Sequence, residues 1–196
     1  QRRQSLQKTV QLSTIKDIPV ILQTVKSKPN DQKCIERAFQ SLFLLATDPD
    51  PEGRLARQVT MANDGMETLV LAIWHHMQST QVILALFQAL WAISADDESS
   101  SSDTLSMGKL QDCRALEGIL FAMQQHATDM NIQESGCDLI TRMTEKLPFD
   151  TPDFKLLVLL LSKNIQGMGT NTKAYSSCLD ALNALCQLSS ENKVAF

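Results

Sequence analysis

The chain has 196 residues, of which 43% are hydrophobic, 5% are aromatic and 20% are charged, and its net charge is −4. This length allows one or two compact domains. No apolar run approaches the roughly 20 residues that a membrane-spanning helix requires. The polar start QRRQSLQKTV is not followed by the apolar stretch of a signal peptide. We therefore expect no membrane span and a cytoplasmic location, with the nucleus as the alternative.

Charge is distributed unevenly along the chain. Residues 1–46 contain eight Lys and Arg against three acids, so they carry +5 and the remainder carries −9. Segregation of this kind affects encounter with charged partners more than it affects fold. The seven Phe, one Tyr and two Trp of the chain lie mostly at core-like positions rather than where they could stack on bases, so nucleic acid binding is not expected. The alternative roles for the basic end are contact with acidic lipid and contact with a preceding repeat. A preceding repeat is expected because the start at Gln1 rather than Met predicts a piece of a longer chain.

Apolar residues recur at steps of three and four through most of the chain, which predicts amphipathic helices. A shorter charged helix is expected from Pro51 up to the Asp-Gly pair at 64–65. No segment alternates with period two for long enough to predict a strand, so the fold class is all-α. The main predicted helices cover residues 18–27, 34–46, 66–77, 82–94, 116–126, 132–144, 154–164 and 174–186.

Four of these helices share a sequence pattern, most plainly CIERAFQSLFLLA (34–46) and VILALFQALWAIS (82–94). In register they align one apolar column, Leu42, Leu90, Ile140 and Leu182, and a mostly small column, Ala38, Leu86, Gly136 and Cys178. Each is preceded by another apolar helix. A repeating unit of about 42 to 50 residues built from such helices is typical of helical solenoids.

Gly136 interrupts a predicted helix, where glycine costs about 1 kcal/mol relative to alanine. Its place in the small column predicts that a neighbouring helix approaches closely there, so that packing offsets the lost helix propensity. A plain irregularity of the helix is the alternative.

The stretch PEGRLARQVTMANDGMETLVLAIW, followed by QVILALFQALWAIS, resembles the armadillo repeat family. A short charged helix precedes Asp-Gly, an apolar helix follows, and a helix with the small-x-x-small-Leu pattern ends the unit. The resemblance implies a right-handed α-solenoid of about four armadillo-like repeats plus the start of a fifth. It covers residues 1–196 as one domain, with units 1–46, 49–94, 103–145 and 151–188 and a stub at 189–196.

The resemblance also implies that a partner binds along a groove lined by the last helix of each unit. The column that holds a backbone-clamping asparagine in the best-known peptide binders holds Leu44, Ala92, Arg142 and Ala184 here. The tryptophan column of nuclear import receptors holds Gln40, Gln88, Asp138 and Asp180. Because neither column matches, capture of a peptide in the manner of import receptors is not expected.

This face offers a mildly acidic stripe instead. The predicted partner-binding residues are Glu36, Gln40, Gln88, Glu134, Asp138, Arg142 and Asp180. Asp138 and Arg142 are four residues apart on one helix, a spacing that favours a local ion pair. The stripe predicts binding of a basic or helical segment of another protein, and an ordinary solvated helical face is the alternative.

The acidic, serine-rich stretch ADDESSSSDT at 95–104 cannot bury apolar area, so it predicts a solvated loop. Four serines there are candidate phosphorylation sites, namely Ser99, Ser100, Ser101 and Ser102. A phosphate would add about −1.5 to −2 charges at each. A plain insertion is the alternative.

No catalytic or cofactor motif stands out. His75 and His76 are adjacent, so they point in different directions on a helix, and no H-E-x-x-H accompanies them. The five cysteines include no C-x-x-C pair, and four of them lie in apolar helical patterns, which predicts buried free thiols. No catalytic residue, metal site or cofactor is therefore expected.

Together these patterns predict a non-catalytic scaffold or adaptor that binds a protein partner. The alternative is a regulatory arm of a larger signalling enzyme whose catalytic domain lies outside this chain. We also expect that the chain can self-associate, because the end helices of a repeat array need polar caps.

Overall fold

The computed structural model describes residues 14–49, 51–95, 114–144, 154–166 and 173–188. Within these ranges all regular structure is helical and no strand occurs. A short 3-10 turn, η1 (Ile15–Asp17), precedes the first α-helix. The α-helices are α2 (Ile18–Ser27), α3 (Gln32–Ala46), α4 (Pro51–Ala62), α5 (Gly65–His75), α6 (Thr80–Ile93), α8 (Ala115–Gln125), α9 (Met130–Thr144), α10 (Phe154–Gln166) and α11 (Lys173–Leu188).

The helices predicted from the sequence are confirmed. Each of the eight main predictions overlaps an observed helix with both ends within two residues, and the short charged helix is α4. Local signals set several of these starts. Asp31 precedes α3 and its Oδ1 accepts the Cys34 N–H at 3.0 Å, while Asp129 precedes α9 and accepts the N–H groups of Asn131 and Ile132. Such caps satisfy backbone donors that have no partner within the helix.

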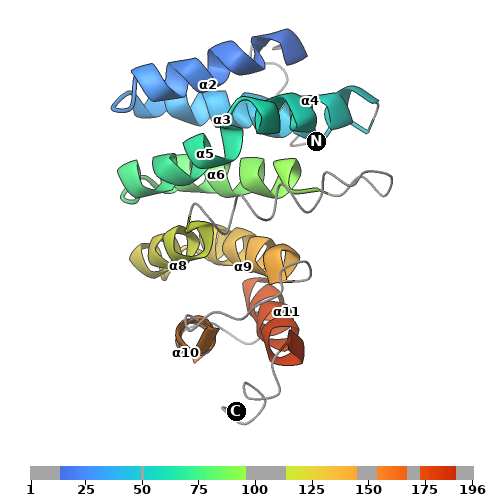
Figure 1. Cartoon of the computed structure of the whole chain (residues 1–196). Helices are drawn as coiled ribbons and strands as arrows, with labels where there is room; N and C mark the ends of the chain where they lie inside the picture. Colours follow the sequence, from blue (N-terminus) through green and yellow to red (C-terminus); the bar gives the residue numbers. More distant parts are fainter. Residues whose placement is uncertain (1–13, 50, 96–113, 145–153, 167–172, 189–196) are drawn as a thin grey trace.

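The helices form two layers. The helices α3, α6, α9 and α11 pack on one another in that order, and α2, α5, α8 and α10 form the second layer in the same way. Figure 1 shows the pairs descending in chain order, from α2 and α3 at one end to α10 and α11 at the other. The apolar column predicted to mark each unit is buried throughout, with exposed fractions of 1% for Leu42, 0% for Leu90 and Ile140 and 6% for Leu182. The core therefore lies between the layers.

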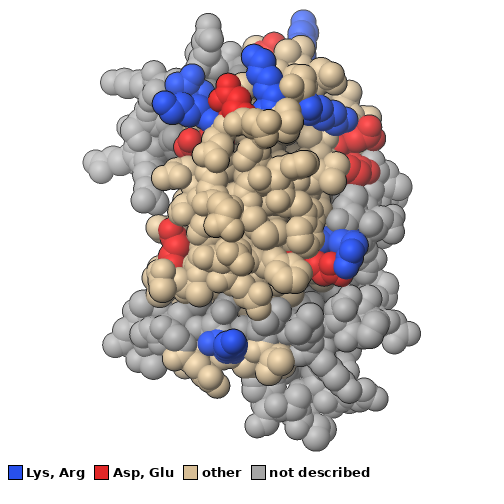
Figure 2. Space-filling view, turned by 90° about the vertical axis from the view of Figure 1, so that its left-hand side faces the viewer, with Lys and Arg blue, Asp and Glu red and all other residues tan. Residues whose placement is uncertain are grey.

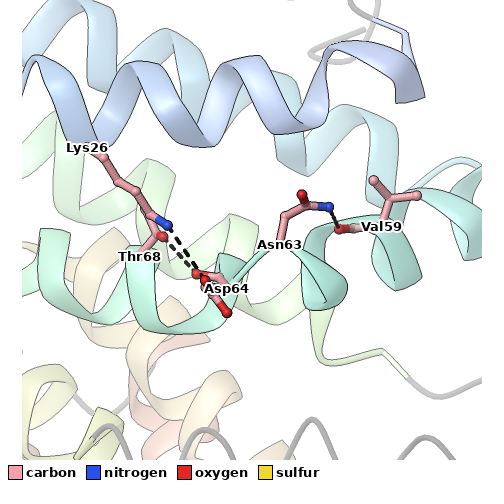
Figure 3. Close-up of polar contacts among 5 residues, drawn as sticks. All are labelled: Lys26, Val59, Asn63, Asp64 and Thr68. Carbon is pink, nitrogen blue, oxygen red and sulfur yellow. Dashed lines mark hydrogen bonds and ion pairs between the residues drawn. The ribbon is translucent and has the colours of Figure 1, made fainter.

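The link between α4 and α5 is a tight corner at Asn63-Asp64-Gly65. Asp64 has a left-handed backbone, with φ of 55°. Figure 3 shows how side chains secure this corner: Asn63 donates to the Val59 carbonyl at 2.7 Å, and Thr68 donates to the Asp64 carbonyl at 2.7 Å. A Cβ at Gly65 would lie 2.5 Å from the Thr60 carbonyl oxygen, so only glycine fits there.

Gly136 of α9 confirms the close approach expected from its column. It is buried against α8, and a Cβ at this position would lie 2.5 Å from Sδ of Met123. The same two helices are joined by Gln133, which is fully buried and donates to the carbonyls of Met123 at 2.8 Å and His126 at 3.1 Å. Those carbonyls lie at the end of α8, so a buried amide completes hydrogen bonds that the helix itself leaves open.

Candidate functional site

The predicted partner-binding residues lie on the layer made by α3, α6, α9 and α11. Glu36 and Gln40 are half-buried on α3, and Gln40 Nε2 donates to Glu36 Oε1 at 3.0 Å. Gln88 is half-buried on α6, the next helix of the layer. Glu36, Gln40 and Gln88 thus lie on two neighbouring helices of the layer. The Glu36 carboxylate already accepts one hydrogen bond, from Gln40 of its own helix.

Arg142 of α9 contacts the preceding helix of the layer. Its Nη1 donates to the Trp91 carbonyl at 2.8 Å, and its guanidinium lies 4.0 Å from the centre of the Trp91 ring. Trp91 is at the end of α6 and is 37% exposed. A cation over an indole face is attracted by the ring's negative face. Arg142 therefore connects α6 and α9 through residues 51 positions apart in the chain.

Glu134 of α9 forms an ion pair with Lys173 at the start of α11. The hydrogen bond to Glu134, its charge and the more distant charge of Asp138 together raise the pKa of Lys173 above its ordinary value. Asp138 is half-buried one turn after Glu134, and Asp180 is exposed two turns after Lys173 on α11. Three acids, Glu134, Asp138 and Asp180, therefore lie at this end of the layer, and Lys173 neutralises part of their charge.

At the other end of the layer lies a hollow of about 650 Å³, where α3 ends, α4 begins and α6 ends. Trp91 and Ala92 form one side, and the charged residues that line it are Arg54, Arg57 and Asp48. Arg57 is also bound to the fold, because its Nη1 donates to the Ala46 carbonyl at 2.7 Å. Sequence analysis did not select Trp91, which stands one position before the column holding Ala92.

The two ends of the stripe differ in charge. Over α9 and α11 lie Glu134, Asp138 and Asp180 with Lys173 and Arg142, whereas the hollow at the end of α6 is lined by Arg54, Arg57 and Asp48 beside Trp91. The candidate phosphorylation sites Ser99, Ser100, Ser101 and Ser102 lie outside the described residues.

The histidines and cysteines differ in burial. His75 is exposed, whereas His76 is only 5% exposed, so the two adjacent histidines point in different directions as the sequence predicts. Cys137 and Cys178 are buried free thiols in contact between α9 and α11, as predicted, while Cys34 is half-buried. Contact with Cys178 and burial raise the pKa of Cys137, which keeps this thiol protonated. Cys113 and the side chain of Cys186 lie outside the described part of the chain.

In the part of the chain that the structure describes, no three His, Cys, Asp or Glu side chains come together as a metal site would require. None of the helices described there is long and apolar enough to cross a membrane.

Comparison with known proteins found no family model that matches the chain, and no curated protein or solved structure that is similar to it. The candidate site is therefore defined by its own geometry alone.

Proposed function

We propose that this chain is a non-catalytic interaction module, an armadillo-like α-solenoid that binds a segment of a partner protein along the layer of α3, α6, α9 and α11. One observation carries the proposal. Charged side chains of α9 reach both neighbours, Arg142 to Trp91 of α6 and Glu134 to Lys173 of α11. Three successive helices thus present one surface whose side chains are held in place, which favours recognition of an extended partner.

The charges of this surface favour a segment of defined polarity. Asp138 and Asp180 leave the α9–α11 end acidic even with Lys173 paired to Glu134. Basic residues of the partner fit there, as the sequence predicts. The opposite end, with Trp91 and its arginines, fits carboxylates or an aromatic side chain of the same segment. Complementary charges of this kind fix the direction of a bound segment and speed its encounter.

The test measures binding of a lysine- and arginine-rich peptide by fluorescence anisotropy at low salt. We expect the double substitution Asp138→Lys with Asp180→Lys to weaken binding at least about tenfold, because two attractive contacts become repulsive. Asp180→Lys alone is matched by Glu52→Lys, which makes the same charge change at an exposed position of α4 away from this end. Equal effects of the two single substitutions would refute the site, since only net charge would then matter.

A further inference from the structure

Each helix of the layer formed by α2, α5, α8 and α10 exposes a large apolar side chain at the same position. These side chains are 65%, 60%, 47% and 64% exposed, and in chain order they are Val20, Leu71, Phe121 and Leu159. Each stands two positions before a residue of its own helix that is at most 2% exposed, namely Leu22, Ile73, Met123 or Leu161. Two positions turn a helix by about 200°, so the exposed side chains point away from the core.

The exposed positions lie on neighbouring helices, because α2, α5, α8 and α10 pack on one another in that order. Between α5 and α8 the side chains touch: Trp74, on the next turn after Leu71 and 40% exposed, packs on Phe121 with ring centres 5.7 Å apart. Single exposed apolar side chains are normal on a soluble protein, whereas contiguous patches mark interaction surfaces. We call Val20, Leu71, Trp74, Phe121 and Leu159 the apolar face.

The helices at the centre of the apolar face carry little charge. The sequences of α5 and α8 contain one Asp, Glu, Lys or Arg each, Glu67 and Glu117, and both lie in the first turn of their helix. Figure 2 shows the side of the molecule toward which α5 and α8 run: its middle is almost free of charged residues, which gather at the top and along the edges. A partner that brought charges here would lose their hydration without gaining ion pairs. The surface that covers this face must therefore be apolar and uncharged as well.

The extent of the apolar face matches that of a dimer interface. A large apolar residue has on the order of 200 Å² of surface, so the observed exposed fractions leave on the order of 500 Å² of apolar surface on this face. A specific interface of standard size covers about 800 Å² on each partner, of which about 60% is apolar. The apolar face thus supplies about the apolar area that one side of such an interface contains.

The row of exposed positions matches a second copy of itself. Packed helices lie about 8–10 Å apart, so the row places one position on each successive helix at that spacing. In a second copy related by a two-fold axis the row has the same spacing and the opposite direction. Leu71 of one copy then faces Phe121 of the other. An acidic membrane fits less well, because it attracts Lys and Arg, whereas the charged residues of α5 and α8 are both acids.

We propose that the chain forms a two-fold dimer through the apolar face, with Leu71, Trp74 and Phe121 of both copies at the centre of the interface. Such a dimer is closed, because both copies use the same surface. It differs from association through the end helices, which adds copies without limit. The acidic stripe lies on the other layer, so both copies keep it available to partner proteins, and the dimer stands or falls independently of that site.

Sedimentation velocity of the whole chain at several concentrations tests the dimer. We expect a dissociation constant on the order of 10 µM for an interface of this size. Leu71→Glu should weaken the dimer at least about tenfold, because a carboxylate then meets an apolar side chain at the centre of the interface. Leu179→Glu is the matched control and should have no effect, because Leu179 is a 43% exposed leucine of α11 in the other layer. Circular dichroism checks that both variants keep their helices.

Three results would overturn the dimer. The first is a chain that stays monomeric far above the expected dissociation constant, and the second is an equal loss for Leu71→Glu and Leu179→Glu. The third is a complex that keeps growing with concentration, which association through the end helices predicts.

The facing of Leu71 and Phe121 is tested by mixing two variants, of which Phe121→Lys is the second. Each variant alone should be largely monomeric. An equimolar mixture of Leu71→Glu and Phe121→Lys chains should dimerise again, because the introduced carboxylate faces the introduced ammonium and the other pair of positions stays natural. Leu71→Glu mixed with Leu71→Lys is the control, in which the two charges are not placed opposite each other. No recovery, or equal recovery in the control mixture, would overturn the proposed pairing.

Discussion

The two helical layers present different surfaces. Over α3, α6, α9 and α11 charged side chains engage their neighbours, as Glu134 does with Lys173 and Arg142 with Trp91. Over α5 and α8 the exposed side chains include Leu71, Trp74 and Phe121, near an apolar cavity of about 190 Å³ that Val25, Ile35 and His76 help to line. The first surface can steer and orient a partner, and its strength depends on salt. The second can supply affinity that salt hardly changes.

The largest expected effect comes from breaking the corner that aims α5 and therefore the apolar face. Gly65→Ala places a Cβ 2.5 Å from the Thr60 carbonyl oxygen and 2.3 Å from Thr60 Cγ2. Because backbone cannot move aside as a side chain can, we expect the free energy of unfolding to fall by about 2–3 kcal/mol. Urea unfolding followed by circular dichroism measures this loss.

Gly136→Ala is the matched comparison. The three atoms nearest to the new Cβ all belong to the side chain of Met123, which is flexible, and alanine gains about 1 kcal/mol of helix propensity. We therefore expect less than half of the loss seen for Gly65→Ala, and a smaller residue at position 123 should restore stability. Adding Thr60→Ser to Gly65→Ala should not, since the carbonyl oxygen remains. A loss at Gly136 as large as that at Gly65 would contradict this reasoning.

The helices were predictable from sequence, but the side-chain geometry between them was only partly so. Leu42, Leu90, Ile140 and Leu182 recur at helical spacing, and this periodicity places them in the core wherever the helices pack. The same helical spacing placed Gly136 in a column of mostly small residues, which predicted its close contact with a neighbouring helix. The grouping of these helices into armadillo-like units remains a prediction, because the helix positions alone do not establish the repeat.

Contacts between residues that are distant in the sequence could not be predicted, because no local sequence pattern marks them. Arg142 was expected to pair with Asp138 on its own helix, whereas the structure places its guanidinium on Trp91 of α6. The sequence predicted that His75 and His76 point in different directions but not which of them is buried, because the burial of His76 depends on Pro29 and the end of α2, which lie against it. Neighbours of this kind are set by tertiary packing, which neither spacing nor composition records.

Two tryptophans of similar exposure sharpen the contrast between the layers. Trp74 is 40% exposed and packs on Phe121, while Trp91 is 37% exposed and lies under Arg142. Double-mutant cycles should give coupling energies of about 0.5–1.5 kcal/mol for the aromatic pair and about 0.5–1 kcal/mol for Trp91 with Arg142. Raising the salt concentration should reduce only the second, because it alone involves a charge. The contrast between the layers fails if salt weakens both couplings equally.

The smallest expected effect is a pH dependence that arises at the apolar cavity. Burial lowers the pKa of His76 in the folded chain below the value near 6.5 that it has when unfolded. Below pH 6.5 the unfolded chain therefore binds more protons at this residue, so stability is complete above that pH and declines as pH falls toward the lowered value. Melting temperatures measured between pH 7.5 and 5.5 should fall more steeply for the natural chain than for His76→Gln, which keeps a polar side chain but cannot titrate. His75→Gln is the comparison and should change the slope less than His76→Gln does, because the charge of His75 is the smallest of the causes that set the pKa of His76. A slope that His75→Gln alters and His76→Gln does not would place the titrating group on the surface.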